Sequence, residues 1–112
     1  MDRQAGLNLL FHAVSDESRR RIIDLLREGQ RLRVGDIAAA FSMSLNGVSK
    51  HLKVLEKAGL IRRQIEGRVH YIEMNPGGLD AGMEWFRFQE NFWNQRLDRL
   101  NQYLNKKEKE KK

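Results

Sequence analysis

The residues with the clearest chemistry lie between positions 44 and 57, where polar and basic side chains recur at helical spacing. Stepping about 100° per residue brings five of them into one arc of the expected helix. Asparagine pairs with adenine in the DNA major groove, lysine with guanine or phosphate, and serine with base edges or the backbone. The arc therefore has the chemistry of a DNA-reading surface. Its members are Asn46, Ser49, Lys50, Lys53 and Lys57.

A solvated helix face that binds nothing has the same composition. The arc therefore indicates DNA binding only in combination with the helix and turn that precede it. A short helix is predicted over 35–41, and its run of alanines allows close contact with a neighbouring helix. The connection Ser42-Met43-Ser44 follows, with Ser44 as N-cap of the next helix and Gly59 just past its end. Two helices joined by so short a turn predict a helix-turn-helix.

Beyond Gly59 the pattern changes to two β-prone runs, 60–65 and 68–74, on either side of Glu66-Gly67. This two-stranded ribbon is basic, and an arginine that protrudes from it suits a phosphate or a narrow minor groove. We expect base-edge contacts from Asn46, Ser49 and Lys50, and backbone or groove contacts from Lys53 and the ribbon arginines. The predicted DNA-binding residues are Ser44, Asn46, Ser49, Lys50, Lys53, Arg62, Arg63 and Arg68.

Length and composition limit the classes of protein to which the chain can belong. Its 112 residues suit one domain, with 21 Lys and Arg against 15 Asp and Glu and a formal charge of +6. We expect a single domain over 1–105 and a disordered, lysine-rich tail over 106–112. The chain has no cysteine, and its longest apolar run, 37–41, is far below the roughly 20 residues of a membrane span. A reducing, cytoplasmic location is therefore expected, without a membrane partner.

Two outer helices carry more apolar surface than one small domain needs. The predicted helix from Leu79 to Leu104 holds an unusually broad aromatic arc, and the first helix carries an apolar stripe without a neighbour in sequence. We expect these surfaces to pair in a homodimer, although the aromatics could also line a pocket for an apolar effector. The predicted interface residues are Leu7, Leu10, Phe11, Val14, Trp85, Phe88, Phe92 and Trp93.

Three segments resemble the ArsR/SmtB transcriptional repressors: 16–26 their second helix, 44–61 their recognition helix, and 67–71 their wing. The resemblance implies a winged helix-turn-helix fold, mainly α, with five helices and a two-stranded hairpin wing. It also implies a homodimer, joined through the first and last helices, that binds a pseudo-palindromic operator in double-stranded DNA.

The chain departs from the metal-sensing members of that family. Where they carry a Cys-x-Cys pair at the start of the third helix, this chain reads Arg33-Val34-Gly35, and the segment 79–104 has no histidine. The sequence therefore predicts no metal site and no cofactor, and it identifies no effector. No paired carboxylates, glycine-rich phosphate loop or HExxH pattern occurs, so no enzyme activity is predicted.

Two other functions compete with DNA binding. A winged helix can serve as a protein-interaction module, but that role does not require the basic arc or the ribbon arginines, and its affinity would depend little on salt. RNA binding would call for exposed aromatic side chains on the strands, where Tyr71 is the only candidate.

Overall fold

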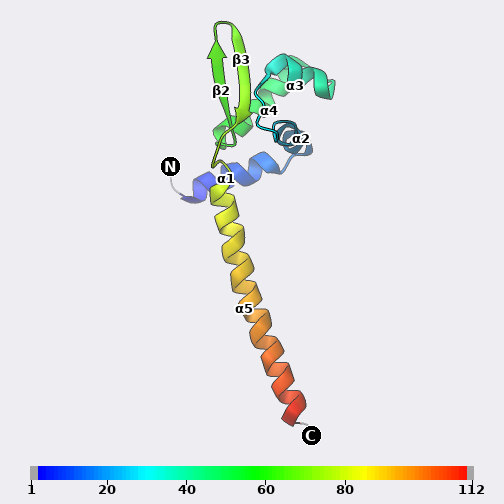
Figure 1. The fold of residues 1–112 in the computed structure, drawn as a ribbon, viewed down its shortest axis with the longest axis vertical. Helices are drawn as coiled ribbons and strands as arrows, with labels where there is room; N and C mark the ends of the chain where they lie inside the picture. Colours follow the sequence, from blue (N-terminus) through cyan, green and yellow to red (C-terminus); the bar gives the residue numbers. More distant parts are fainter. Residues whose placement is uncertain (1–2, 111–112) are drawn as a thin grey trace. The chain divides into compact units, whose positions relative to one another are not determined.

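The computed structural model describes residues 3–110, which divide into two compact units, one ending at Gly82 and the other beginning at Met83. Most of the chain is helical, and the helices and a small sheet form the predicted winged helix-turn-helix (Figure 1). In chain order the elements are α1 (Arg3–Val14), α2 (Glu17–Leu25), β1 (Leu32–Arg33), α3 (Val34–Phe41), α4 (Leu45–Lys57), β2 (Ile61–Glu66), β3 (Val69–Met74) and α5 (Asp80–Glu110).

The turn between α3 and α4 has the predicted three residues. Ser42 ends α3 in the left-handed conformation, with φ of 54°. Ser44 then begins α4 as its N-cap, because its hydroxyl accepts a hydrogen bond from the backbone N–H of Gly47 at 3.0 Å. Asp16 caps α2 in the same way, accepting from the N–H of Arg19 at 3.1 Å. The starts of α2 and α4 are therefore determined by local side-chain chemistry.

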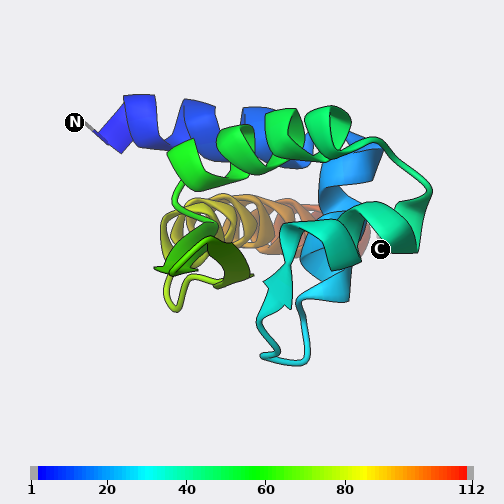
Figure 2. The ribbon, with the colours of Figure 1, turned by 90° about the horizontal axis from the view of Figure 1, so that it is seen from above.

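The core of the first unit is built around α4. Val48, Leu52 and Leu55 are fully buried, as the spacing along the helix predicts. Seen from above, α1 and α4 run side by side and α2 crosses their end (Figure 2). One face of α4 is thus held by the core, which leaves the opposite face to solvent.

A buried arginine joins these three helices. The side chain of Arg19, in α2, is only 9% exposed, and its guanidinium donates to the carbonyl oxygens of Ala13 at 2.8 Å and His12 at 3.0 Å. The same group lies 3.4 Å from Nδ1 of His51, on α4. Because the last carbonyls of a helix have no partner within it, Arg19 satisfies the end of α1 and ties it to α4.

The sheet has three strands where the sequence predicts two. The short strand β1 pairs with β3 in antiparallel fashion, with Leu32 opposite Ile72, and the strand order is β1-β3-β2. A strand of two residues is too short to show an alternating pattern, which is why it was missed. The hairpin turn also lies one residue later than predicted, at Gly67-Arg68, with Gly67 at φ of 63°.

Two of the predicted dimer-interface residues in α1, Leu7 and Leu10, lie in the core of the single chain. Leu7 and Leu10 are 4% and 5% exposed within the single chain, because α1 packs on α4 and the start of α5. A Cβ atom at Gly82 would collide with the Cδ2 atom of Leu10, so a larger residue there would force the Leu10 side chain to shift. Phe11 and Val14 remain half-buried and accessible from outside.

Helix α5 continues to Glu110, through most of the segment for which the sequence predicts disorder (Figure 1). Lysine and glutamate both have high helix propensity, and lysines in the last turn interact favourably with the helix dipole. Residues 111–112, also in that predicted tail, lie outside the described part of the chain. Among the helices of residues 3–110, none has both the length and the apolar composition to cross a membrane.

Candidate nucleic-acid interface

The polar arc of α4 lies on the surface, opposite its buried face. The side chains of Asn46, Lys50 and Lys53 are exposed, and Ser49 is half-buried between them. Ser44 precedes them at the N-cap, where its hydroxyl already accepts from Gly47 and keeps its own proton free to donate. One exposed helix face therefore presents the amide, hydroxyl and ammonium groups that the sequence predicts for DNA contacts.

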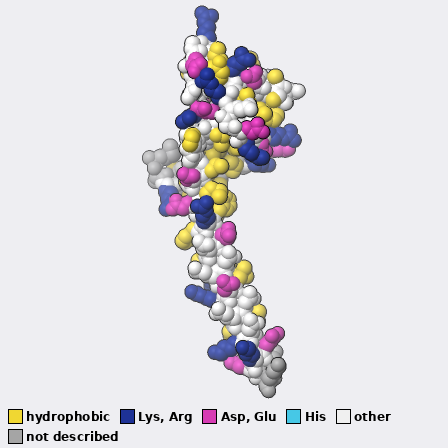
Figure 3. Space-filling view, viewed as in Figure 1, with side chains coloured by type: hydrophobic (Ala, Val, Ile, Leu, Met, Phe, Trp, Pro, Cys, Tyr) yellow, Lys and Arg dark blue, Asp and Glu magenta, His cyan; other side chains and the backbone are white. Residues whose placement is uncertain are grey.

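The wing arginines have three different environments. Arg68 lies in the hairpin turn and is exposed. The space-filling view shows dark-blue, positively charged side chains at the end of the hairpin (Figure 3). Arg62 is exposed but forms an ion pair with Glu73 across the hairpin, at 2.7 Å. Within residues 3–110, Arg68 has no acidic partner at all. Of the three, it is the one whose charge is not already neutralised by an acidic neighbour.

Arg63 forms a clasp between the wing and α4. Its guanidinium donates to both carboxylate oxygens of Glu56, at 2.6 and 3.4 Å, and lies 3.0 Å from Nδ1 of His70. The side chain is 21% exposed, so the pair is partly shielded from water. A two-pronged contact of this kind has defined geometry. Arg63 thus holds β2 against the end of α4, a role that spacing along the sequence could not reveal.

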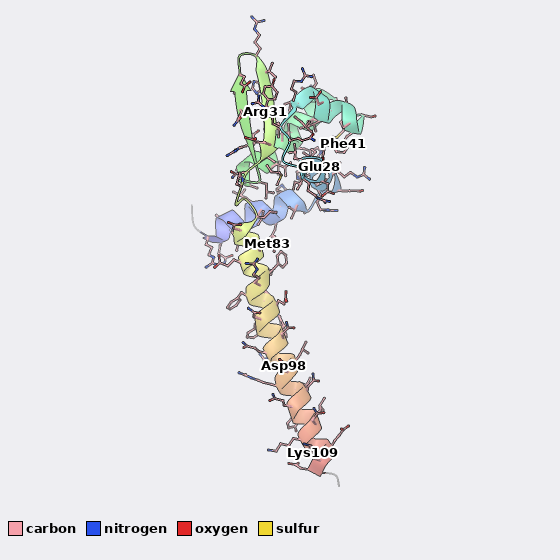
Figure 4. The ribbon with its side chains drawn as sticks, in the orientation of Figure 1. Glu28, Arg31, Phe41, Met83, Asp98 and Lys109 are labelled. Atoms are coloured by element: carbon pink, nitrogen blue, oxygen red, sulfur yellow. The ribbon has the colours of Figure 1, made fainter. Side chains whose placement is uncertain are left out.

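A second cluster, also missed by the sequence, anchors the far side of the wing. Arg31 stacks on the ring of Tyr71, 4.1 Å from its centre, and bonds to Glu66 at 2.7 and 3.3 Å and to Gln64 at 3.1 Å. Figure 4 labels Arg31 beside the hairpin. Its hydrogen bonds lower the pKa of Glu66 and raise the pKa of Arg31. The cluster joins the segment before β1 to both strands of the hairpin.

A groove of about 450 Å³ separates the wing from the first turns of α3 and α4. Its walls combine apolar side chains with three guanidinium groups and an imidazole. The carboxylate of Asp36 pairs with Arg33 at 3.3 Å, but both side chains stay well exposed. The groove therefore lies between the polar arc and the wing, and its lining combines apolar side chains with three arginines, of which Arg33 and Arg63 are paired with acidic residues. The lining residues are Arg33, Val34, Gly35, Leu45, Ser49, Arg63, Arg68, Val69 and His70.

His51 lies at the edge of the buried face of α4 and away from the polar arc, as its angular position predicts. Its side chain is half-buried, with Nδ1 near Arg19 and 3.9 Å from a carboxylate oxygen of Asp16. The backbone N–H of Arg19 lowers the pKa of Asp16.

Residues 3–110 hold no group of three histidine, aspartate or glutamate side chains that could bind a metal ion.

Helix α5 exposes a long apolar surface. Beyond Gly82 its large apolar side chains are between 37% and 67% exposed in the single chain, and Figure 3 shows several of them along the helix. One stripe, at spacings of three, four or seven residues, is formed by Met83, Phe86, Trp93, Leu97, Leu100 and Leu104. A second, at its side, holds the aromatic residues Trp85, Phe88, Phe92 and Tyr103.

The comparisons with known proteins agree with this geometry. A family model described as a helix-turn-helix domain matches residues 14–64. The transcriptional repressor SdpR of Bacillus subtilis is 37% identical over 79 residues, which cover 70% of this chain and 87% of SdpR.

Two solved structures extend the match to the fold. An ArsR-like transcriptional regulator from Rhodococcus sp. RHA1 is 25% identical, with a TM-score of 0.79 over 90% of this chain and 92% of its own. Mb0332 of Mycobacterium bovis, a homodimeric winged helix-turn-helix DNA-binding domain, is 28% identical, with a TM-score of 0.62 over 77% of each chain.

Proposed function

The chain belongs to the ArsR/SmtB family of winged helix-turn-helix transcriptional regulators, and we propose that it acts as a homodimeric repressor of a pseudo-palindromic DNA operator. The observation that carries this proposal is the exposed polar face of α4, with Asn46, Lys50 and Lys53, next to a wing whose tip carries Arg68. Such a surface offers both base-edge and phosphate contacts.

In the proposed complex α4 enters the major groove. Asn46, Ser49 and Lys50 contact base edges, while Lys53 and Arg68 contact the backbone or the flanking minor groove. Ser44 adds a hydroxyl donor at the start of the helix. Arg62 has to exchange Glu73 for a phosphate, and Arg63 acts mainly by holding the wing in place, because Glu56 already neutralises its charge.

The proposed dimer buries the exposed apolar surface of α5. A surface this long is unusual on a small monomer, and a second copy of the chain would cover it. We retain Phe11, Val14, Trp85, Phe88, Phe92 and Trp93 as interface residues. In a two-fold dimer the two recognition helices lie about 34 Å apart, one turn of DNA, which predicts half-sites about 10 base pairs apart.

Selection of bound duplexes from a random library, at about 0.15 M salt, tests the proposal. Sedimentation of the same complex counts the protomers on each duplex. We expect a symmetric motif occupied by one dimer. Binding without any enriched motif would refute sequence-specific repression and favour a protein-interaction module, in which the α5 surface docks a different partner.

A further inference from the structure

Leu45 is a large apolar side chain that the fold leaves in water. It is the first residue of α4, and its side chain is 60% exposed, whereas Val48, Leu52 and Leu55 of the same helix are fully buried. The cap that starts the helix is the hydroxyl of Ser44, so the start of α4 does not depend on a leucine at the next position. Neither the core nor the helix cap accounts for this side chain.

A single exposed leucine is common on protein surfaces, so the position of Leu45 matters more than its exposure. Leu45 lines the groove between α4 and the wing together with Ser49, which lies one helical turn further along. Arg33 and Arg68 line the same groove. An apolar side chain thus lies next to a proposed base reader and in the same groove as Arg68, whose guanidinium has no acidic partner among residues 3–110 and suits a phosphate.

DNA offers one apolar group on its base edges that fits this position. The C5-methyl group of thymine projects into the major groove, where apolar side chains distinguish it from the other bases. Residues in the first turn of a recognition helix are those that reach base edges. On the premise of the proposed function, we infer that Leu45 contacts the thymine methyl group and so selects thymine at one position of each half-site.

Replacing single thymidines by deoxyuridine in the selected duplex tests this inference, because the replacement removes only the methyl group. At one position in each half-site, we expect the wild-type protein to bind the deoxyuridine duplex about fourfold more weakly, from the loss of one buried methyl-sized group. Leu45→Ala should bind both duplexes equally, whereas Leu45→Met, which keeps an apolar side chain, should retain the preference.

Ile65→Ala is the matched control. Ile65 is 61% exposed on β2 and does not line the groove, and a wing in the minor groove meets no thymine methyl group. This variant should keep the full preference for thymine. Thermal melting of each variant verifies that it is folded.

The inference is overturned if the wild-type protein is indifferent to every deoxyuridine, if Leu45→Ala still discriminates, or if the selected half-site has no thymine. In each of these cases the protein still binds a symmetric duplex, so the proposed function stands. Failure to select any symmetric duplex would overturn both.

Discussion

Arg63 and Arg68 belong to the same hairpin, yet their surroundings give them different roles. Arg63 is held by Glu56 and lies against His70, whereas Arg68, in the turn, has no acidic partner among residues 3–110. A guanidinium that is already neutralised adds little attraction for a phosphate, but a free one adds the full charge. We therefore propose that Arg68 contributes most of the attraction of the wing for DNA.

Arg68→Ala should weaken binding to all duplexes by similar factors. Because a backbone contact releases about one counterion, the slope of log affinity against log salt should fall by about one unit. Fluorescence anisotropy over a salt series measures this slope. Arg27→Ala is the charge-matched control, since Arg27 lies just beyond the end of α2, is exposed, and pairs with Asp24 in that helix. Equal slopes for wild type and Arg68→Ala would remove this residue from the interface.

At the residue scale, what the sequence could predict depends on how local each contact is. The caps Asp16 and Ser44 act within three residues, so their roles could be inferred from the sequence alone. The clasp of Arg63 and the stacking of Arg31 join residues from different elements, and they appear only once the chain is folded. Six of the eight predicted contact residues are exposed, and only Ser49 and Arg63 are half-buried.

At the scale of elements, the wing is held in place by charged contacts on both sides. Arg63 connects β2 to α4, and Arg31 connects the segment before β1 to Glu66 and Tyr71. A two-stranded hairpin has little stability in isolation. The short strand β1 and these side chains therefore supply the support that orients the wing.

The Arg31 contact predicts a pH dependence for the wing. Since Arg31 lowers the pKa of Glu66 below 4.5, the contact stabilises the fold above pH 4.5 and is lost as the pH falls through the lowered value. An NMR titration of the Glu66 carboxyl should give a midpoint below 4.5 in the wild type, and Arg31→Ala should bring it back toward 4.5.

Arg62→Ala is the control for this titration, because Arg62 pairs with Glu73 on the other strand. It should leave the Glu66 midpoint unchanged. If Arg31→Ala also leaves the midpoint unchanged, the ion pair does not form in solution. The free-energy effect should be small in either case, since exposed ion pairs contribute little to stability.

The boundaries of the helices and strands agree with the sequence patterns at some positions and differ at others. Helices α3 and α4 and the three residues between them are as predicted, because caps and apolar spacing both mark them. The strand β1 has too few residues to form a pattern, and the hairpin turn moves by one residue, to Gly67-Arg68. At the C-terminus, charge and polarity suggested disorder, while the same lysines and glutamates favour a helix.

At the scale of the whole molecule, the large apolar residues other than Leu45, Ile65 and Leu79 form two sets. One set is buried in the first unit, and the other remains exposed along α5. Sequence patterns could not separate them, because an apolar stripe looks the same whether it packs within one chain or against another. Leu7 and Leu10 show this, since their stripe suggested an interface but they are buried within the subunit.

Leu97→Glu should dissociate the proposed dimer. A charge buried without a partner costs several kcal/mol, so the dissociation constant should rise by about a hundredfold or more. Sedimentation equilibrium measures this change. Asn105→Asp, which adds the same charge on the polar side of α5, away from both apolar stripes, should leave the dimer intact. An unchanged dimer in Leu97→Glu would place the interface elsewhere.

Asn46→Ala tests most directly whether the exposed face of α4 reads base sequence. The measurement is the ratio of affinities for the selected duplex and for a scrambled duplex of the same composition. Loss of a paired asparagine should lower this ratio by a factor corresponding to about 1–3 kcal/mol, with little change for the scrambled duplex. A ratio equal to that of the wild type would contradict the claim that Asn46 reads the operator.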